Sequence, residues 1–142
     1  MRIFRNFILN VTLIFLCSCI YTKNSNVVTL SSFSYMSYFT SDIIVNGNDF
    51  GMGAGGLFID SYLEPGAYYV YWTDAGTGKQ FKSVNQIIIP NQINKEYAVV
   101  HIYPNNQAEI IFTNAFPEKT VKGFEFEKIY KKPKIVLQEP KL

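Results

Sequence analysis

The sequence predicts an all-β fold, an antiparallel β-sandwich of about seven short strands that follows an apolar N-terminal segment. Runs of β-branched and aromatic residues recur along the chain, and Gly, Asn, Asp and Pro separate them at short intervals. No stretch has the spacing of apolar residues that is typical of an amphipathic helix. The chain has 142 residues, of which 48% are hydrophobic and 17% charged, so one domain can form its own core.

Residues 1–18 have the pattern of a bacterial lipoprotein signal peptide. Arg2 and Arg5 precede an apolar run of about ten residues, which is too short for a transmembrane helix of about 20 residues. The run ends in Leu16-Cys17-Ser18-Cys19, which resembles the lipobox at which such precursors are cleaved. Cys19 would then be the acylated first residue of the mature chain. An ordinary signal peptide with incidental cysteines is the alternative.

An acylated Cys19 would anchor the protein in a membrane, because each buried CH2 group contributes about 0.8 kcal/mol and two or more chains bind stably. Ile20 follows the cysteine, where an Asp would be an inner-membrane signal in enterobacteria-like lipoproteins. We therefore expect an outer-membrane location with the domain facing the periplasm. Residues 19–26 would be the lipidated cysteine and a tether, residues 27–130 the sandwich, and residues 131–142 a basic tail.

The first half of the sandwich should contain three or four strands. They are expected near Val27–Phe39, at Thr40–Val45 before the turn pair Asn46-Gly47, and at Leu57–Tyr62. Between the last two, the glycine-rich stretch Phe50–Gly56 is expected to form a loop, because glycine adopts positive φ easily.

Ala67–Thr73 is the clearest strand, and the turn Glu64-Pro65-Gly66 precedes it. Alternate residues on a strand point to opposite faces, and here both faces carry aromatic side chains. We therefore expect this strand to be central in its sheet or covered on both sides. A turn at Asp74–Gly78 should lead into the next strand, Lys79–Ile89.

The last strands are expected to form a hairpin of Tyr97–Tyr103 with Ala108–Thr113 around Pro104–Gln107. Ala98, Val100 and Ile102 should face inward, and His101 on the other face should be an ordinary strand residue, either packed or half-exposed. A late strand is expected at Val121–Tyr130.

The residue types exclude several classes of function. The mature chain has no Arg, which argues against recognition of nucleic acid. Processing would use both cysteines, and His101 is the single histidine, so neither a cysteine nor a multi-histidine metal site is expected. Neither a P-loop nor a Gly-x-Ser-x-Gly elbow occurs. We therefore predict a non-enzyme without catalytic residues, metal or cofactor.

The aromatic content favours a protein-binding surface. The chain has 10 Tyr and 12 Phe. Most should belong to the core, but an exposed Tyr is a low-entropy contact residue that is enriched at interfaces. The predicted partner contacts are Phe50 and Met52 in the glycine-rich loop and Tyr69 and Tyr71 on the clearest strand. Partial exposure is expected at six tyrosines: Tyr35, Tyr38, Tyr62, Tyr69, Tyr71 and Tyr103.

Several of these features, in their order along the chain, resemble a family of small Gram-negative lipoproteins associated with type VI secretion loci that carry lipase effectors. The resemblance covers roughly Ser34 to Pro90 and also includes the lipobox at Cys19. Its motifs, in order, are an aromatic strand leading to Val45-Asn46-Gly47, the pair Gly55-Gly56, a short strand, Pro65-Gly66, and a strand carrying Trp72. Family members often have a Cys pair where this chain has Leu57 and Phe58.

The resemblance implies an immunity role, in which a periplasm-facing lipoprotein binds a secreted lipase-type toxin and blocks it. Two other classes stay open. A structural or assembly lipoprotein of the cell envelope would have a constitutive envelope partner. A carrier of a small ligand would have a deep apolar cavity inside the sandwich.

Overall fold

The computed structural model describes residues 26–130. The predicted signal peptide, the acylation at Cys19, nearly all of the tether and the basic tail lie outside these residues.

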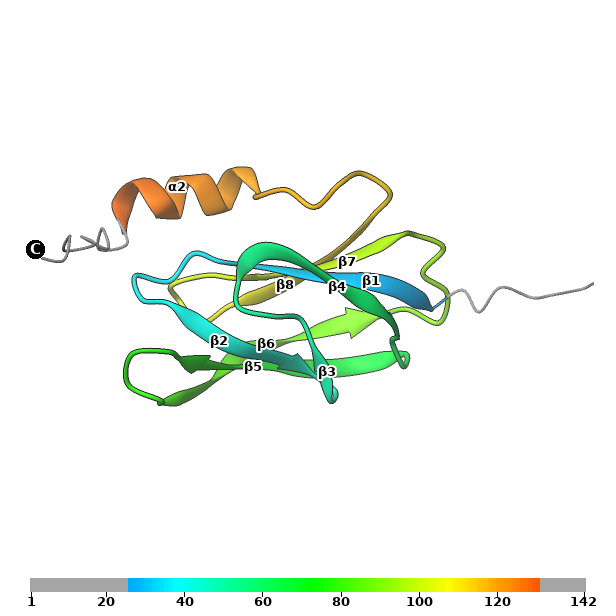
Figure 1. The fold of residues 1–142 in the computed structure, drawn as a ribbon, viewed down its shortest axis with the longest axis horizontal. Coiled ribbons are helices and arrows are strands. Elements are labelled where there is room, and N and C mark those ends of the chain that lie inside the picture. Colours follow the sequence, from blue (N-terminus) through cyan, green and yellow to red (C-terminus); the bar gives the residue numbers. More distant parts are fainter. Residues whose placement is uncertain (1–25, 131–142) are drawn as a thin grey trace, which may run out of the picture.

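The described residues form two four-stranded sheets that face each other, as the sequence predicts (Figure 1). Antiparallel pairs dominate, but the two central strands of one sheet, β1 and β7, run parallel, which the sequence did not predict. The first sheet has the order β4 (Ala54–Tyr62), β1 (Val27–Ser34), β7 (Tyr97–Ile102), β8 (Ala108–Thr113). The second sheet has the order β3 (Asn48–Asp49), β2 (Thr40–Val45), β5 (Gly66–Asp74), β6 (Gln80–Ile89).

The core lies between the two sheets, and alternation along the strands supplies it. Ala98, Val100 and Ile102 of β7 are buried there, and β7 pairs with β8 as the predicted hairpin. Val70 and Trp72 of β5 meet them from the second sheet. Burial of large apolar side chains at this interface is the main stabilising term of such a fold.

Strand β5 is central in the second sheet, between β2 and β6, as predicted. Only one of its faces is covered by the first sheet. Trp72 on the inner face is 1% exposed, whereas Tyr71 on the outer face is 49% exposed. Both faces of this strand are therefore aromatic for different reasons, one as core and one as surface.

The turns also follow the sequence, with one shift of boundary. Asn46 and Gly47 both have positive φ, which fits the tight turn expected between β2 and β3. The glycine-rich stretch is a loop only up to Gly53, because β4 already begins at Ala54. A side chain at Gly53 would collide with Ser34 and Thr40, so this position needs glycine for space as well as for its φ.

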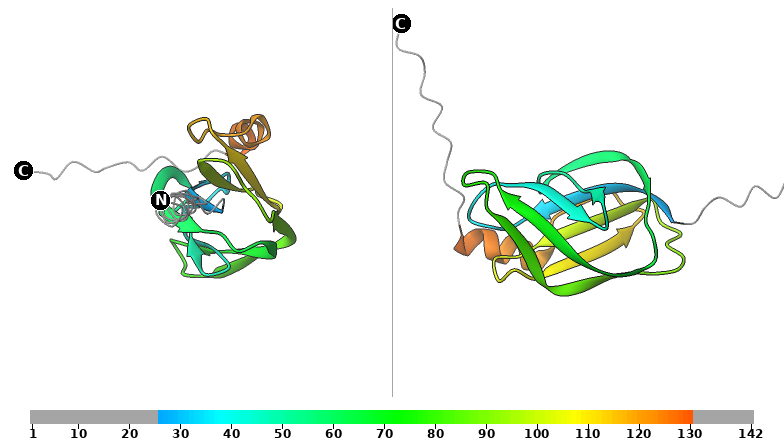
Figure 2. Two further views of the ribbon diagram at one scale, coloured as in Figure 1. Left: turned by 90° about the vertical axis from the view of Figure 1, so that its right-hand side faces the viewer. Right: turned by 90° about the horizontal axis from the view of Figure 1, so that it is seen from below.

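The predicted late strand at Val121–Tyr130 is wrong: Val121–Ile129 forms a helix, α2. Thr120 caps it, since its side-chain oxygen accepts a hydrogen bond from the Gly123 N–H at 3.0 Å. The helix lies on the side of the first sheet that faces away from the second sheet (Figure 2). Its contact is made by Gly123 and by Phe126, which packs on Tyr103. Tertiary packing rather than an apolar stripe therefore stabilises this helix.

Substitution of Gly123 by Ala should weaken the docking of α2. An added Cβ would overlap the ring of Tyr35, which hydrogen bonds hold in place. Overpacking of this kind costs about 1–3 kcal/mol, against a gain of up to about 1 kcal/mol in helix propensity. Hydrogen exchange of the α2 amides should speed up in Gly123→Ala. The control Gly76→Ala, where a Cβ meets only a side-chain oxygen at 3.3 Å, should not change it. Unchanged protection in both variants would contradict the packing argument.

Candidate functional site

The outer face of the second sheet carries a row of exposed side chains. The strand register places Ile44 of β2 opposite Tyr71 of β5, and Tyr71 opposite Lys82 of β6. One step along β5, Tyr69 lies opposite Gln86 and is half-buried. The Lys82 ammonium lies 4.3 Å from the centre of the Tyr69 ring, so this lysine covers one face of the ring. Tyr71 is thus the more open of the two tyrosines.

A hollow of about 340 Å³ lies beside Tyr71 on this face. Its volume is near the lower limit for small-molecule sites, so it suits a single side chain or a small group. Because it lies on a sheet face with polar and apolar lining residues, it differs from the deep apolar cavity that a carrier would need. The lining residues are Asp42, Ile44, Tyr71, Trp72, Thr73 and Gln80.

Asp42 at the edge of this hollow has an unusual backbone. Its φ is 49°, in the left-handed region, and the β2–β5 register is irregular between Ser41 and Ile44. A non-glycine residue in a sparsely populated conformation costs on the order of 1 kcal/mol, and irregularities of this kind often re-aim a side chain near a functional site. Ser41 Oγ donates a hydrogen bond to Asp42 Oδ2 at 3.0 Å. Sequence reasoning missed Asp42, although an Asp inside a strand is a usable signal.

The four predicted contact residues do not form one site. Tyr69 and Tyr71 lie together on the outer sheet face, but Met52, which is 65% exposed, is not among the residues that line the hollow. Phe50 is wrong as a surface contact, because it is fully buried in the core. Its backbone is held between the sheets: its N–H donates to Ile43 O, and its own carbonyl accepts from Ser32 Oγ.

The tyrosine exposures are also corrected in part. Tyr62 and Tyr71 are exposed, and Tyr38 and Tyr69 are half-buried, as expected. Tyr35 and Tyr103 are both 1% exposed, so their expected exposure is wrong. They are covered by α2, which the sequence did not predict.

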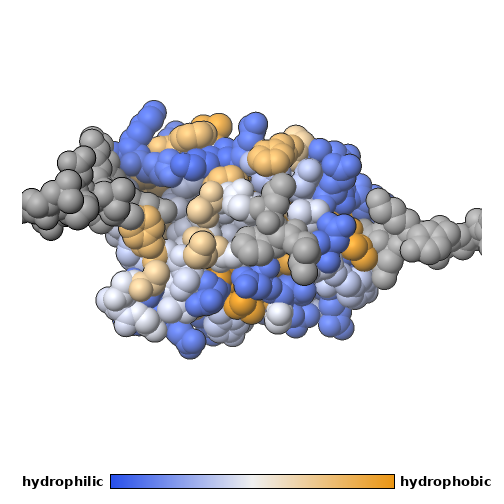
Figure 3. Space-filling view, in the orientation of Figure 1, coloured by the Kyte–Doolittle hydropathy of each residue, from blue (hydrophilic) through white to orange (hydrophobic). Residues whose placement is uncertain are grey.

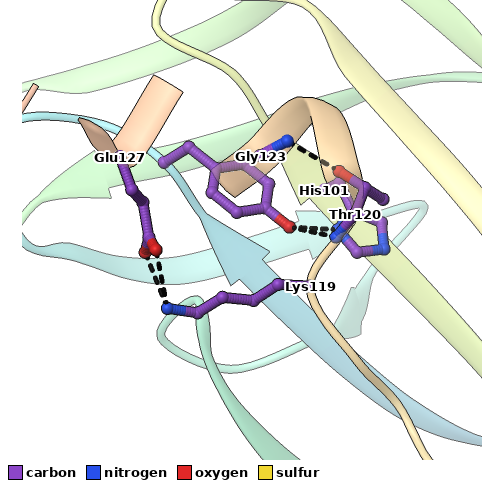
Figure 4. Close-up of polar contacts among 6 residues, drawn as sticks. His101, Lys119, Thr120, Gly123 and Glu127 are labelled. Atoms are coloured by element: carbon purple, nitrogen blue, oxygen red, sulfur yellow. Dashed lines mark hydrogen bonds and ion pairs between the residues drawn. The ribbon is translucent and has the colours of Figure 1, made fainter. Parts of the chain in front are cut away.

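Under α2, a partly buried polar network joins the first sheet to the helix (Figure 4). The backbone N–H of Thr120 donates to the Tyr35 hydroxyl oxygen at 3.0 Å, and that hydroxyl lies 2.9 Å from Nδ1 of His101. The Tyr35 hydroxyl accepts from Thr120 and shares one hydrogen bond with Nδ1, and the direction of that bond follows the tautomer of the His101 ring. Next to it, the Tyr103 hydroxyl donates to Glu109 at 2.9 Å and meets Thr120 Oγ1 at 3.0 Å.

The environment of His101 fits a structural role. The residue is 1% exposed, so it is packed, which is one of the two expected states. Its ring is nearly parallel to those of Phe33 and Tyr35, with centroids 5.6 and 6.0 Å away. Burial lowers the pKa of His101 from 6.5 to about 4, and the nearby Glu109 charge opposes this shift. Burial likewise raises the pKa of Tyr35 and of Tyr103. In this network, uncharged Tyr35, His101 and Tyr103 side chains link the first sheet to the start of α2, and Tyr103 bonds the Glu109 carboxylate. The hydrogen bond at Nδ1 of His101 involves a tyrosine and not a serine nucleophile.

The exposed side of α2 is a second surface with apolar residues. Val121 is 79% exposed, Phe124 51% and Ile129 70%. Lysines and glutamates interrupt them, and Lys119 pairs with Glu127 at 2.7 Å. In Figure 3 the top of the molecule, where α2 lies in Figure 1, accordingly carries hydrophobic and hydrophilic residues side by side. This surface is therefore of mixed polarity.

Residues 26–130 contain neither a metal-binding cluster nor a membrane-spanning helix. No three His, Cys, Asp or Glu side chains in this part of the chain gather closely enough to hold a metal ion. The one helix described there is too short and too polar to cross a bilayer. Comparison of the chain with protein-family models, curated proteins and solved structures finds no match.

The buried histidine should make folding sensitive to acid. In the unfolded chain His101 binds a proton below about pH 6.5, whereas in the folded chain its pKa is about 4, so it stays neutral until the pH falls to that value. Stability should therefore fall as the pH drops through this window, by about 2–3 kcal/mol between pH 7 and pH 4.5 from His101 alone. Urea unfolding at several pH values measures it.

The variant His101→Gln isolates this contribution. Carboxylates titrate in both proteins, so the difference between the two pH profiles belongs to His101, the single histidine of the chain. The variant should be less stable at pH 7 but lose less stability on acidification. Parallel profiles would contradict the assigned role.

Proposed function

We propose that the protein is a membrane-anchored lipoprotein whose sandwich binds another protein through the outer face of its second sheet. The partner that we favour is a secreted lipase-type toxin, which the bound domain would block. The toxin part of the proposal rests on the resemblance to immunity-type lipoproteins, and the surface part rests on the geometry of β5.

The exposed ring of Tyr71 is the observation that carries the proposal. It lies in the middle of a sheet face, between Ile44 and Lys82, and beside a hollow. A half-exposed tyrosine next to a concavity is typical of an energetic centre of a protein interface. Sheet faces are also rigid, so little conformational entropy is lost when a partner binds.

An anchored binding protein needs no catalytic residue to neutralise a lipase. An incoming lipase must reach its substrate at the membrane, where the acylated domain would already be concentrated. Binding across the mouth of the enzyme would then exclude the lipid. This agrees with the network at His101, whose histidine is neutral, buried and bonded to a tyrosine.

An acylated Cys19 makes a direct prediction for cells. The chain should incorporate labelled palmitate and fractionate with the outer membrane, because acyl chains anchor stably when two or more are present. Cys19→Ala should lose the label and leave the membrane fraction. The matched control Cys17→Ala should keep both, since only Cys19 is the lipid acceptor. Equal labelling of the two variants, or none of the wild type, would contradict the anchor.

Inhibition of a lipase tests the binding face. A chain of residues 20–142 keeps every described strand and helix. Added in equimolar amount, it should abolish the activity of the lipase effector that the same bacterium secretes. Tyr71→Ser should weaken inhibition about tenfold or more, as expected for loss of an interface centre. Tyr62→Ser on the first sheet, where the tyrosine is 48% exposed against 49% for Tyr71, should stay within about twofold.

Two outcomes would count against the proposal. Unchanged lipase activity at equimolar domain would reject the toxin as partner. If the domain instead binds a constitutive envelope protein, and deletion leaves the cell insensitive to the toxin, a structural or assembly role replaces immunity.

A further inference from the structure

The hollow beside Tyr71 has the chemistry of a site for a cationic side chain. It combines a carboxylate at Asp42, a half-exposed aromatic ring at Tyr71, and the hydroxyl and amide of Thr73 and Gln80. Carboxylates and aromatic ring faces both attract cations, and the two polar groups can accept hydrogen bonds from a donor-rich group.

We propose that this hollow receives an arginine side chain of the protein partner, with the guanidinium stacked on Tyr71 and paired with Asp42. The proposal rests on the proposed function, because it names the chemistry of the partner at that same face. Arginine fits better than lysine, since a planar guanidinium stacks on an aromatic ring and pairs with a carboxylate through two N–H groups.

The carboxylate is positioned in advance. Asp42 lies in the irregular segment of β2 with a positive φ, and Ser41 Oγ holds its Oδ2 atom. A carboxylate can accept about four hydrogen bonds, so the bond from Ser41 leaves capacity for a guanidinium. The strained backbone thus has a purpose: it holds an acidic group at the rim of an aromatic hollow.

The surrounding charge favours a cation as well. Residues 20–116 contain four Lys and seven Asp or Glu, which gives a net charge of −3. Exposed Asp49 lies opposite Ile44, on the side of the row away from Lys82. Lys82 itself, the base on this face nearest to Tyr71 in register, has its ammonium over the Tyr69 ring.

The arginine must come from a different protein. The chain contains arginine only at Arg2 and Arg5, both in the segment predicted to be removed. A second mature copy therefore cannot supply the guanidinium. The volume of about 340 Å³ also suits one long side chain rather than a larger cofactor.

Titration with acetyl-arginine methylamide, followed by amide NMR of residues 20–142, tests the site. Acetyl-citrulline methylamide is the matched probe, because it has nearly the same shape without the charge. Shifts should concentrate at Asp42, Tyr71, Thr73 and Gln80, and apparent affinity should be about fivefold or more higher for the arginine probe.

Two variants and a control make the test specific. Asp42→Asn keeps the fold, because Asn tolerates positive φ, and it should remove the preference for arginine over citrulline. Tyr71→Leu should weaken binding of the arginine probe about threefold or more. Asp60→Asn removes an exposed carboxylate of the first sheet and should leave the preference intact.

The outcomes separate this inference from the proposed function. If citrulline binds as well as arginine, or if the shifts spread over both sheets, the arginine site is wrong even where lipase inhibition is observed. If arginine is preferred and Asp42→Asn removes the preference while Tyr71→Ser still inhibits the lipase fully, the site stands and the proposed interface is wrong.

Discussion

The close packing of Gly123 on the ring of Tyr35 is the contact on which the arrangement of surfaces depends. It lets α2 lie flat against the first sheet, and Thr120 at the helix start can then bond Tyr35 and Tyr103. The helix consequently covers the part of the first sheet's outer face where Tyr35 and Tyr103 lie. No helix covers the outer face of the second sheet among the described residues, and Tyr71 and the hollow beside it lie there.

The residues of the network under α2 attach the helix and differ from the residues that we propose to contact a partner. Tyr35, His101 and Tyr103 are buried and hydrogen bonded in it, so each would be costly to leave without its partner. His101 takes part through its hydrogen bond with Tyr35, and its lowered pKa is the consequence of burial. A histidine that could suggest catalysis in the sequence is thus part of the attachment of the helix. Tyr71 and the hollow, which we propose as the contact with a partner, lie on the opposite side of the sandwich.

The alternation of inward and outward residues along the strands made most of the fold predictable from the sequence. Ala98, Val100 and Ile102 were predicted as inward residues, and the Asn46-Gly47 turn was predicted from its chemistry. The helix was not visible, because Val121–Ile129 lacks an apolar stripe and gains its stability from one glycine and one aromatic contact. Phe50 was expected at the surface because it begins a glycine-rich loop. Its backbone is instead hydrogen bonded to Ile43 of β2 and Ser32 of β1, and its side chain is buried in the core. Such long-range contacts leave no periodic signal.

The candidate site shows the same division between local and long-range information. Tyr71 could be predicted as a surface residue from its strand alone, since its neighbour Trp72 points to the core and successive side chains point to opposite faces. Asp42 could not be, because its place beside Tyr71 depends on an irregular register between β2 and β5. A strand in regular register with β5 would have no residue with a left-handed backbone at this position. The local strain at Asp42 is therefore best understood together with the hollow, as the cost of placing a charge where a flat sheet would present none.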